Sequence, residues 1–311
     1  MLDLSEGRAM IAVDGSDEAA WSALGGRLTA EQGAQLKRFP KHLQRRALRH
    51  GNDWALLVGR PLAQYRKLVP LGQGSSALRE EASRLAEHEG WELREAVGHS
   101  PGRTPYYRQS TGFTCGPATL GMALSTLRGR PAPDRALEIQ IWREATTVHA
   151  PNGPGGCDPF GLALAAERRG LKTTVVKSHR GPTFTDRGSD ESRRDLIRFV
   201  QETLQAEAEA VGIETQYRSF DAAFLRAHVE AGGQAILLVD QVHMHAEMCP
   251  HWILLTEWKN GRFRAHDPWL DDDQAESTSD VTDLPLPPST LETIGHYGNP
   301  SYQAAILLSA R

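Results

Sequence analysis

Cysteine is scarce in this chain, where only Cys115, Cys157 and Cys249 occur among 311 residues. They are odd in number and far apart in the sequence, so they do not form the paired disulfide framework of a small secreted protein. Such usage is typical of a reducing compartment. We therefore expect a cytoplasmic protein with free thiols.

Long apolar runs and an excess of charge of one sign are also missing. No stretch approaches the ~20 apolar residues that a membrane span requires. Residues 1–15 have neither the basic nor the apolar segment of a signal peptide. The formal net charge of −4 creates no overall attraction to nucleic acid or to a membrane. We expect neither as a partner, and the sequence gives no indication of the oligomeric state.

What the chain does contain is the composition of an ordinary globular protein, with 40% hydrophobic and 24% charged residues. Gly and Pro cluster at residues 98–105, which predicts a linker. We place a domain boundary there, between an amino-terminal α+β domain of unknown role at residues 1–104 and a second domain at residues 105–311. The first domain has three predicted elements: a helix over 29–50, a strand over 54–58 and a helix over 76–89.

The second domain has a clearer pattern, with most of its helices before its strands, which is typical of the α+β class. Asn260-Gly261 separates two β-rich runs and predicts a hairpin. The predicted helices are 116–128, 134–145, 159–169 and a long amphipathic one with Leu196, Val200, Leu204, Ala208 and Val211 in phase. The predicted strands are 171–176, 234–239, 251–258, 262–266 and the final apolar run, AAILLS.

Cys115 lies directly before Gly116, Pro117 and an apolar run with helical spacing. The thiolate is the nucleophilic form of cysteine, and the amino end of a helix stabilises it. Gly116 is expected to allow a substrate close to the backbone. Gln109 is expected to donate an amide hydrogen bond to a developing oxyanion, beside the backbone N–H of Cys115. A buried structural cysteine is the alternative, and Cys115 alone does not decide between the two.

A partner histidine for a catalytic cysteine is expected far away in the sequence. His251 opens one predicted strand, and Asp267 follows the next strand across the Asn-Gly hairpin. Antiparallel neighbours would bring these two side chains together as a base and its orienting carboxylate. His266 is then expected to be a core histidine.

These residues together resemble the C39-type peptidases, a branch of the papain-like cysteine proteases. The resemblance rests on Gln109, on Cys115-Gly116-Pro117-Ala118, on His251 with the apolar run to Leu255, and on Asp267-Pro268. The segments 141–147, 155–170 and 284–298 further resemble a stand-alone bacterial subgroup. The similarity covers roughly residues 105–311. Because the chain has no predicted membrane span and no ATPase motif, the exporter role of better-known relatives does not carry over.

The resemblance implies a papain-like fold, in which a helical part carries the cysteine and an antiparallel sheet carries the histidine and the aspartate. It implies that Cys115 is the nucleophile, His251 the general base and then acid, Asp267 the residue that orients His251, and Gln109 part of the oxyanion hole. The predicted chemistry is acyl transfer through a thioester on Cys115. No cofactor and no metal are expected.

Three functions remain open at this stage. The first is a peptidase or amide hydrolase that acts on a peptide, a small amide or a thioester, including one bound to a carrier protein. The second is an amide-forming acyltransferase or peptide-processing enzyme of a biosynthetic pathway. The third is a non-enzymatic binding module, which is disfavoured because all four site residues are present.

Other polar segments have simpler explanations. The histidines and the cysteine of residues 243–251 are metal-ligand types, but their spacing matches no common zinc pattern. We expect the loop 241–250 to border the substrate cleft and to be a candidate lid. The basic run within residues 32–52 predicts a solvated helix face, with contact to an anionic partner as the alternative. The acidic stretch 271–283 predicts a solvated loop.

Overall fold

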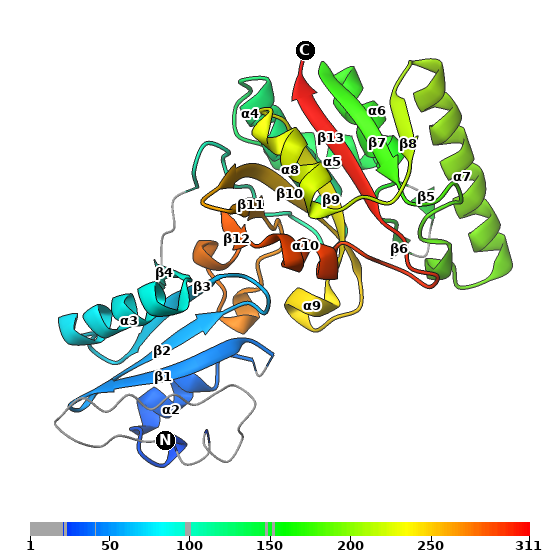
Figure 1. Ribbon diagram of the computed structural model, residues 1–311. Coiled ribbons are helices and arrows are strands. Elements are labelled where there is room, and N and C mark those ends of the chain that lie inside the picture. The colour runs from blue at the N-terminus through cyan, green and yellow to red at the C-terminus, as the bar shows by residue number, and fades with distance from the viewer. Residues whose placement is uncertain (1–20, 22–23, 41, 97–100, 147–148, 151–152) are drawn as a thin grey trace. The chain divides into compact units, whose positions relative to one another are not determined.

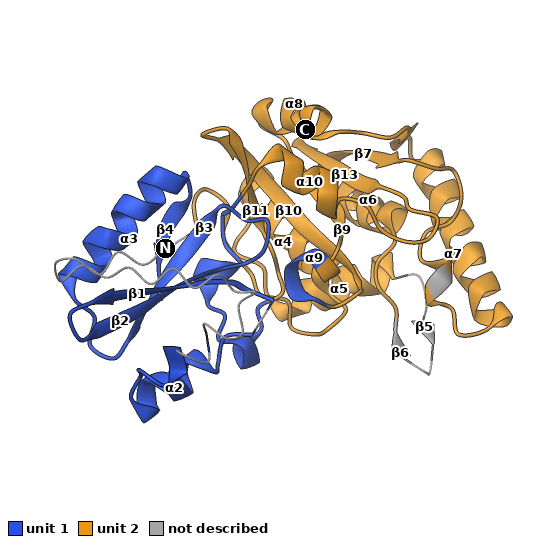
Figure 2. Ribbon diagram, turned by 60° about the horizontal axis from the view of Figure 1, so that its bottom comes forward, with its two compact units in different colours: residues 1–100, 243–246, 270–285 blue, residues 101–242, 247–269, 286–311 orange. Residues whose placement is uncertain are grey.

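The computed structural model describes residues 21, 24–40, 42–96, 101–146, 149–150 and 153–311 (Figure 1). The predictions made for residues 1–15, for Lys41 in the basic run and for the first three residues of the linker, 98–100, lie outside these ranges. The contacts divide the chain into two compact units (Figure 2). The first unit consists of residues 1–100, 243–246 and 270–285, and the second of residues 101–242, 247–269 and 286–311.

The first unit is built on a four-stranded sheet with apolar residues on both faces. Its strands are β1 (Gln44–His50), β2 (Asp53–Gly59), β3 (Tyr65–Leu71) and β4 (Glu92–Glu95), in that order. The first three are antiparallel, whereas β4 runs parallel to β3 after the intervening helix α3 (Ser76–Glu89). Consecutive residues of β1 point to opposite faces of the sheet: Ala47 packs with Trp54 and Phe39, and Leu48 packs with Leu78 of α3.

The helix predicted over residues 29–50 is wrong for most of its length. The helix α2 covers only Ala30–Leu36, with Thr29 as its N-cap, and residues 44–50 form the strand β1. Pro40 lacks an N–H and separates the two elements. Apolar residues occur at helical spacing over residues 29–50 because the apolar residues at the end of α2 are followed in the sequence by those on one buried face of β1. The basic residues of β1 are therefore on a strand at the sheet edge, not on a solvated helix.

The acidic stretch 271–283 is not the solvated loop that its composition predicts. Glu276 accepts two hydrogen bonds from the guanidinium of Arg60, at 3.0 and 2.9 Å, and both side chains are buried. Asp280 accepts a hydrogen bond from the hydroxyl of Tyr65 at 3.0 Å and forms an ion pair with Lys67. Residues 270–285 thus complete the first unit, because their acids neutralise cations that lie about 200 residues earlier in the chain.

The second unit contains most of a seven-stranded sheet with the strand order β12-β11-β10-β9-β13-β7-β8. From β11 through β10, β9 and β13 to β7, each strand is antiparallel to the next, and β8 is parallel to β7. Their bounds are β7 Leu171–Lys177, β8 Glu214–Tyr217, β9 Gln234–Asp240, β10 Pro250–Lys259, β11 Arg262–His266, β12 Leu284–Leu286 and β13 Ala304–Ala310. A separate two-stranded ribbon is formed by β5 (His149–Ala150) and β6 (Gly153–Pro154).

The helices predicted for this unit are confirmed. They are α4 (Cys115–Leu127), α5 (Arg135–Ala145), α6 (Pro159–Arg168) and α7 (Glu191–Ala210). Two further helices of this unit, α8 (Ala222–Glu230) and α10 (Pro288–Ile294), were not predicted, and α9 (Val242–His245) belongs mostly to the first unit. Asp158 caps α6 by accepting a hydrogen bond from the N–H of Phe160 at 2.7 Å. In α7 the predicted apolar face is only partly correct, because Leu196 and Val211 are 43% and 58% exposed.

The α+β class is confirmed. Residues of α4 and α6 share one core with residues of β7, β9, β10 and β13. This packing places the amino end of α4 near the start of β10, where the candidate site lies. Among the described residues, no helix has the length and the hydropathy to cross a membrane.

Candidate active site

Cys115 is the first residue of α4 and is 7% exposed. Its helix is buried along almost its whole length, so the position of the thiol is fixed by the core. Gly116 is also buried, and a Cβ atom there would lie 2.9 Å from a methyl carbon of Leu162 and 3.2 Å from the ring of Trp252. The glycine is therefore required by core packing, which the sequence-based explanation of substrate access missed.

His251 and Asp267 are brought together by the predicted hairpin. Asn260 and Gly261 have φ values of +53° and +75°, as the two-residue turn between β10 and β11 requires. The Nε2 atom of His251 lies 2.7 Å from Oδ1 of Asp267, and both side chains are buried. The same carboxylate oxygen accepts a hydrogen bond from the N–H of Trp269 at 2.9 Å, which fixes its orientation.

The bond to Asp267 occupies Nε2 of His251 and leaves Nδ1 for the hydrogen bond with the thiol of Cys115. Burial lowers the pKa of His251, but the charge and hydrogen bond of Asp267, followed by those of Cys115, raise that pKa to about 10. The geometry and the charges therefore favour an imidazolium that is held between a carboxylate and a sulfur atom.

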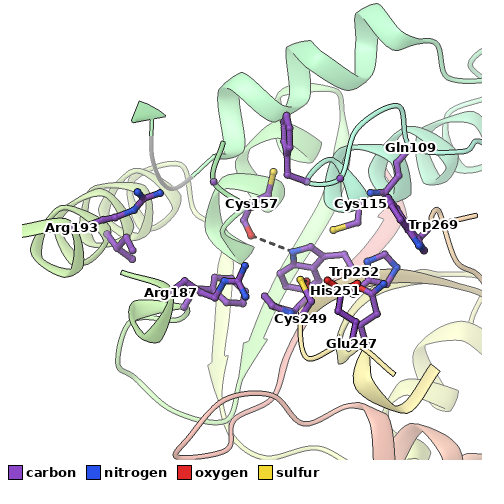
Figure 3. Close-up of a pocket in the computed structure, with 18 residues that line it drawn as sticks. Gln109, Cys115, Cys157, Arg187, Arg193, Glu247, Cys249, His251, Trp252 and Trp269 are labelled. Atoms are coloured by element: carbon purple, nitrogen blue, oxygen red, sulfur yellow. Dashed lines mark hydrogen bonds between the residues drawn. The ribbon is translucent and has the colours of Figure 1, made fainter. Parts of the chain in front are cut away.

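Gln109 lies beside Cys115 in the same cavity (Figure 3). Its backbone N–H donates to the carbonyl of Pro268 at 3.0 Å, and its side-chain Nε2 donates to the carbonyl of Thr111 at 2.7 Å. The amide nitrogen carries two hydrogens, and this contact uses one of them. The other remains for an oxygen atom that enters the cavity next to the amino end of α4.

Glu138 of α5 organises the loop that carries Gln109, and sequence reasoning did not find it. Its buried carboxylate accepts hydrogen bonds from the hydroxyl of Tyr107 at 2.9 Å, from the N–H of Ser110 at 2.8 Å and from the hydroxyl of Thr114. Burial and this carboxylate raise the pKa of Tyr107. The only signal in the sequence was an acidic residue in the first turn of an amphipathic helix, which is commonplace.

The cavity next to Cys115 has a volume of about 460 Å³ and is lined by all three cysteines of the chain. Burial, with the charges of Cys115 and Asp158, raises the pKa of Cys157 well above its usual range. Burial also raises the pKa of Cys249. The carbonyl of Cys157 accepts a hydrogen bond from the indole of Trp252 at 3.2 Å, which gives that cysteine a structural part in the wall.

His266 is a core histidine, as expected: it is fully buried and its Nε2 lies 2.9 Å from the carbonyl of Thr104. The loop 241–250 borders the cavity through Gln241, Glu247, Cys249 and Pro250, whereas its histidines 243 and 245 are not among the lining residues. Within the described residues, no group of three or more potential ligands is arranged to hold a metal ion.

A buried thiol at the start of a helix, next to an imidazole and a carboxylate, is an arrangement that suits enzymes with a cysteine nucleophile. The family comparison agrees with it. The model of the Peptidase C39-like family matches residues 104–309, and the chain belongs to this family. The resemblance to C39-type peptidases is confirmed by this match. No curated protein sequence is significantly similar to the chain.

Three solved structures are among those similar to this chain. One is a double glycine motif protease from an AMS/PCAT transporter in complex with the leader peptide, with 13% identity over 69% of this chain and 97% of that one, and a TM-score of 0.33. The peptidase domain of Streptococcus ComA, a bifunctional ABC transporter of a quorum-sensing pathway, has 10% identity, coverages of 68% and 100%, and a TM-score of 0.33. A protein from Bacillus anthracis described as a C39-like peptidase has 12% identity, coverages of 67% and 95%, and a TM-score of 0.35.

Proposed function

We propose that the protein is a cysteine peptidase or amide hydrolase that forms an acyl-enzyme on Cys115. The observation that carries this proposal is the hydrogen-bonded series from Cys115 through His251 to Asp267, in a cavity that also contains the amide of Gln109. The cavity volume of about 460 Å³ lies within the usual range for ligand sites and suits a short stretch of a peptide.

In the first half of the reaction, the Cys115 thiolate attacks the carbonyl carbon of an amide. A C–S bond forms, and the C–N bond breaks when the His251 imidazolium transfers its proton to the leaving nitrogen. In the second half, the neutral imidazole takes a proton from water, the hydroxide oxygen attacks the thioester, and the C–S bond breaks. The proton then stays on His251, and the thiolate–imidazolium pair is restored.

The negative oxygen of each tetrahedral intermediate accepts hydrogen bonds from the backbone N–H of Cys115 and from Nε2 of Gln109. Asp267 keeps the imidazole in the required tautomer and stabilises its charged form. The contacts of Asp267 support this role, because its Oδ1 atom lies 2.7 Å from Nε2 of His251 and accepts a hydrogen bond from the N–H of Trp269 at 2.9 Å.

The decisive experiment identifies the acyl acceptor. A panel of peptides and thioesters is incubated with the protein, with and without millimolar amines, and the products are identified by mass spectrometry. Free acid formed at a rate that does not depend on the amine supports hydrolysis. Amide as the main product would show that the enzyme is an acyltransferase. No turnover and no adduct on Cys115 with any substrate would favour a binding module.

A matched control separates the acyl-enzyme from background hydrolysis. The Cys115→Ser protein can form an ester in place of the thioester, and the Cys115→Ala protein can form neither. A mass increase equal to the acyl group in the wild type and in the Ser variant, but not in the Ala variant, assigns the covalent intermediate to this residue.

A further inference from the structure

Two arginines line the same cavity as Cys115 but take no part in the proposed chemistry. Arg187 is the last residue of the short 3-10 helix η1 (Thr185–Arg187), and Arg193 lies in the first turn of α7. Figure 3 shows both guanidinium groups on the side of the cavity away from Gln109 and Trp269. The charge of Arg187 acts on Cys249, which places it within electrostatic reach of the central part of the cavity.

These two arginines differ from two other arginines of α7. Arg194 and Arg198 each form an ion pair with Glu191 at 2.9 Å. Among the described side chains, neither Arg187 nor Arg193 has a carboxylate within ion-pair distance. Arg194 and Arg198 thus share one carboxylate, whereas Arg187 and Arg193, which line the cavity, have no ion-pair partner among the described side chains.

The turn that carries Arg187 is held by buried polar groups. The side-chain amide of Gln201 accepts a hydrogen bond from the N–H of Thr183 and donates one to its carbonyl, both at 2.6 Å. Phe184 has a φ of +62°, which is uncommon for a residue with a large side chain, and its N–H donates to the hydroxyl of Tyr302 at 3.1 Å. Backbone strain of this kind persists where the surroundings impose it, and it is frequent at ligand sites.

Apolar side chains complete this end of the cavity. Phe184 and Ile197 are 8% and 3% exposed and line it together with the two arginines. The described lining contains one acidic residue, Glu247, which comes from the loop before β10. A lining that combines buried apolar groups with two guanidinium groups suits a short aliphatic stem that ends in a carboxylate, because guanidinium binds carboxylate through two parallel hydrogen bonds.

We propose that Arg187 and Arg193, with Phe184 and Ile197 as the apolar wall, form a subsite for a carboxylate group of the substrate. The substrate class is then an acidic peptide, or a peptide that ends in a free carboxylate near the bond that is cleaved. This inference rests on the proposed function, because it assigns a substrate class to the cavity that contains Cys115.

The test compares matched peptides. One residue at a time is changed to Glu, Gln or Lys on both sides of the cleaved bond, with the carboxyl end either free or amidated. We expect Glu at one position, or the free carboxyl end, to raise kcat/KM by about tenfold over its neutral counterpart, mainly through KM, because the contact is made equally in the ground and transition states. Arg187→Gln and Arg193→Gln should each remove most of this preference. Arg198→Gln, on the same helix as Arg193, should leave the preference unchanged.

The outcomes separate this subsite from the proposed function. Turnover without any preference for a carboxylate, or a preference that both variants retain, would overturn the subsite alone. If no peptide is cleaved, binding to the Cys115→Ala protein is measured by calorimetry with the same pairs. Tighter binding of the acidic member that is lost in Arg187→Gln would support the subsite, and equal binding would overturn it. A preference for Glu identifies a side chain, and a preference for the free end identifies a terminal carboxylate.

Discussion

At the residue scale, the three thiols share one cavity but differ in their surroundings. Cys115 begins a helix and hydrogen-bonds to His251, whereas burial raises the pKa of both Cys157 and Cys249. Because all three thiols line the cavity, their location does not distinguish them. The fraction of each thiol that is ionised to thiolate should therefore decide which cysteine reacts.

Iodoacetamide at pH 6.5 should alkylate Cys115 at least about tenfold faster than the other two thiols, because only this thiol is paired with an imidazolium. Peptide mapping by mass spectrometry of the native protein at several reaction times measures the three rates. The Cys115→Ala protein is the control, and its remaining cysteines should react no faster than in the wild type. Preferential labelling of Cys157 or Cys249, with Cys115 unmodified, would contradict the assignment of the nucleophile.

The pH dependence follows from His251. Folding raises its pKa from the ordinary value of 6.5 to about 10, so the imidazolium is present through neutral pH and is lost as the pH rises through about 10. The same shift means that its contribution to stability is complete below pH 6.5 and disappears as the pH approaches 10. We expect the alkaline limb of kcat/KM to lie near this value.

Asp267→Asn should move that alkaline limb toward neutral pH, because it removes the largest contribution that raises the pKa of His251. The rate of Cys115 alkylation as a function of pH provides a second measurement that needs no substrate. Turnover should decrease less than in Cys115→Ala, because the carboxylate only orients and stabilises the imidazolium. An unchanged alkaline limb in the Asn variant would exclude this electrostatic role.

Gln109→Ala tests the proposed oxyanion hole. Loss of one oxyanion donor typically lowers kcat by about 10²–10³-fold with little change in KM, because the hydrogen bond strengthens only in the transition state. Steady-state kinetics with any cleaved peptide would measure both parameters. Should kcat stay intact, backbone N–H groups alone would form the hole.

The sequence predicted the approach of His251 and Asp267 because each lies at a fixed distance from an Asn-Gly turn. Gln109 and Cys115 were found because they precede a strong helical pattern. Glu138 and the two cavity arginines could not be predicted, because their neighbours come from other elements. Nothing in the local sequence distinguishes Arg193, which has no ion-pair partner among the described side chains, from Arg194, which is paired to Glu191.

At the scale of elements, one carboxylate of α5 connects three positions of the loop that leads into α4. Glu138 accepts hydrogen bonds from Tyr107, Ser110 and Thr114, which lie on both sides of Gln109. The loop is therefore ordered by a residue that lines no part of the cavity. This makes Glu138 a positioning residue for Gln109 and for the start of the helix that carries Cys115.

Glu138→Gln replaces one acceptor oxygen of a buried side chain by a donor and leaves at least one of the three donors without its acceptor. We expect kcat to fall by about tenfold with KM nearly unchanged, and stability to fall by about 1–3 kcal/mol. Glu144→Gln, which affects a partly exposed ion pair on the same helix, is the matched control. Combined with Gln109→Ala, the loss of kcat should be less than the product of the two single effects, because both act through one side chain. If the combined loss of kcat equals the product of the two single losses, then Glu138 does not act through Gln109.

Some helices and strands were predicted correctly from the sequence and others were not, and their local signals explain the difference. Helices with a cap residue and a clear stop, such as α3 and α6, have the predicted bounds within a residue or two. The strand β1 was misassigned because both faces of its sheet are covered, so consecutive residues Ala47 and Leu48 are buried and strand alternation disappears. Burial on two faces is a tertiary property that the local pattern does not contain.

At the scale of the whole molecule, the two units are interleaved along the chain. The polypeptide leaves the second unit after Trp269, contributes residues 270–285 to the first, and then returns. The segment begins directly after Asp267 and Trp269, which hold and border the site. The acidic residues for which the segment was predicted to be a solvated loop include those that anchor it to the first unit. No sequence pattern predicts that Glu276 pairs with Arg60, which lies 216 residues earlier in the chain.

A fragment that begins at residue 101 should therefore lose order in residues 270–285. The fragment lacks Arg60, Tyr65, Lys67 and Arg94, which in the full chain hold Glu276, Asp280 and the carbonyls of Ser279 and Thr282. Removal of one partner from a buried ion pair costs about 3–5 kcal/mol. Limited proteolysis should cut this segment of the fragment at least about tenfold faster than in the intact protein, because cleavage follows the population of the open form.

Two full-length variants make the same comparison without truncation. Arg60→Met leaves the buried carboxylate of Glu276 without its guanidinium partner and should open the segment to proteolysis, with a lower midpoint of unfolding. Arg79→Ala removes an ion pair with Glu95 whose side chains are 58% and 53% exposed, and exposed pairs contribute only about 0–1 kcal/mol. It should change neither property. If residues 270–285 resist the protease in the fragment and in Arg60→Met as well as they do in the intact wild type, then the segment is ordered without its partners in the first unit. Its acidic residues would then not be what anchors it. If the segment opens to the protease and turnover falls as well, then the position of Asp267 in the active site depends on the anchoring of residues 270–285 in the first unit.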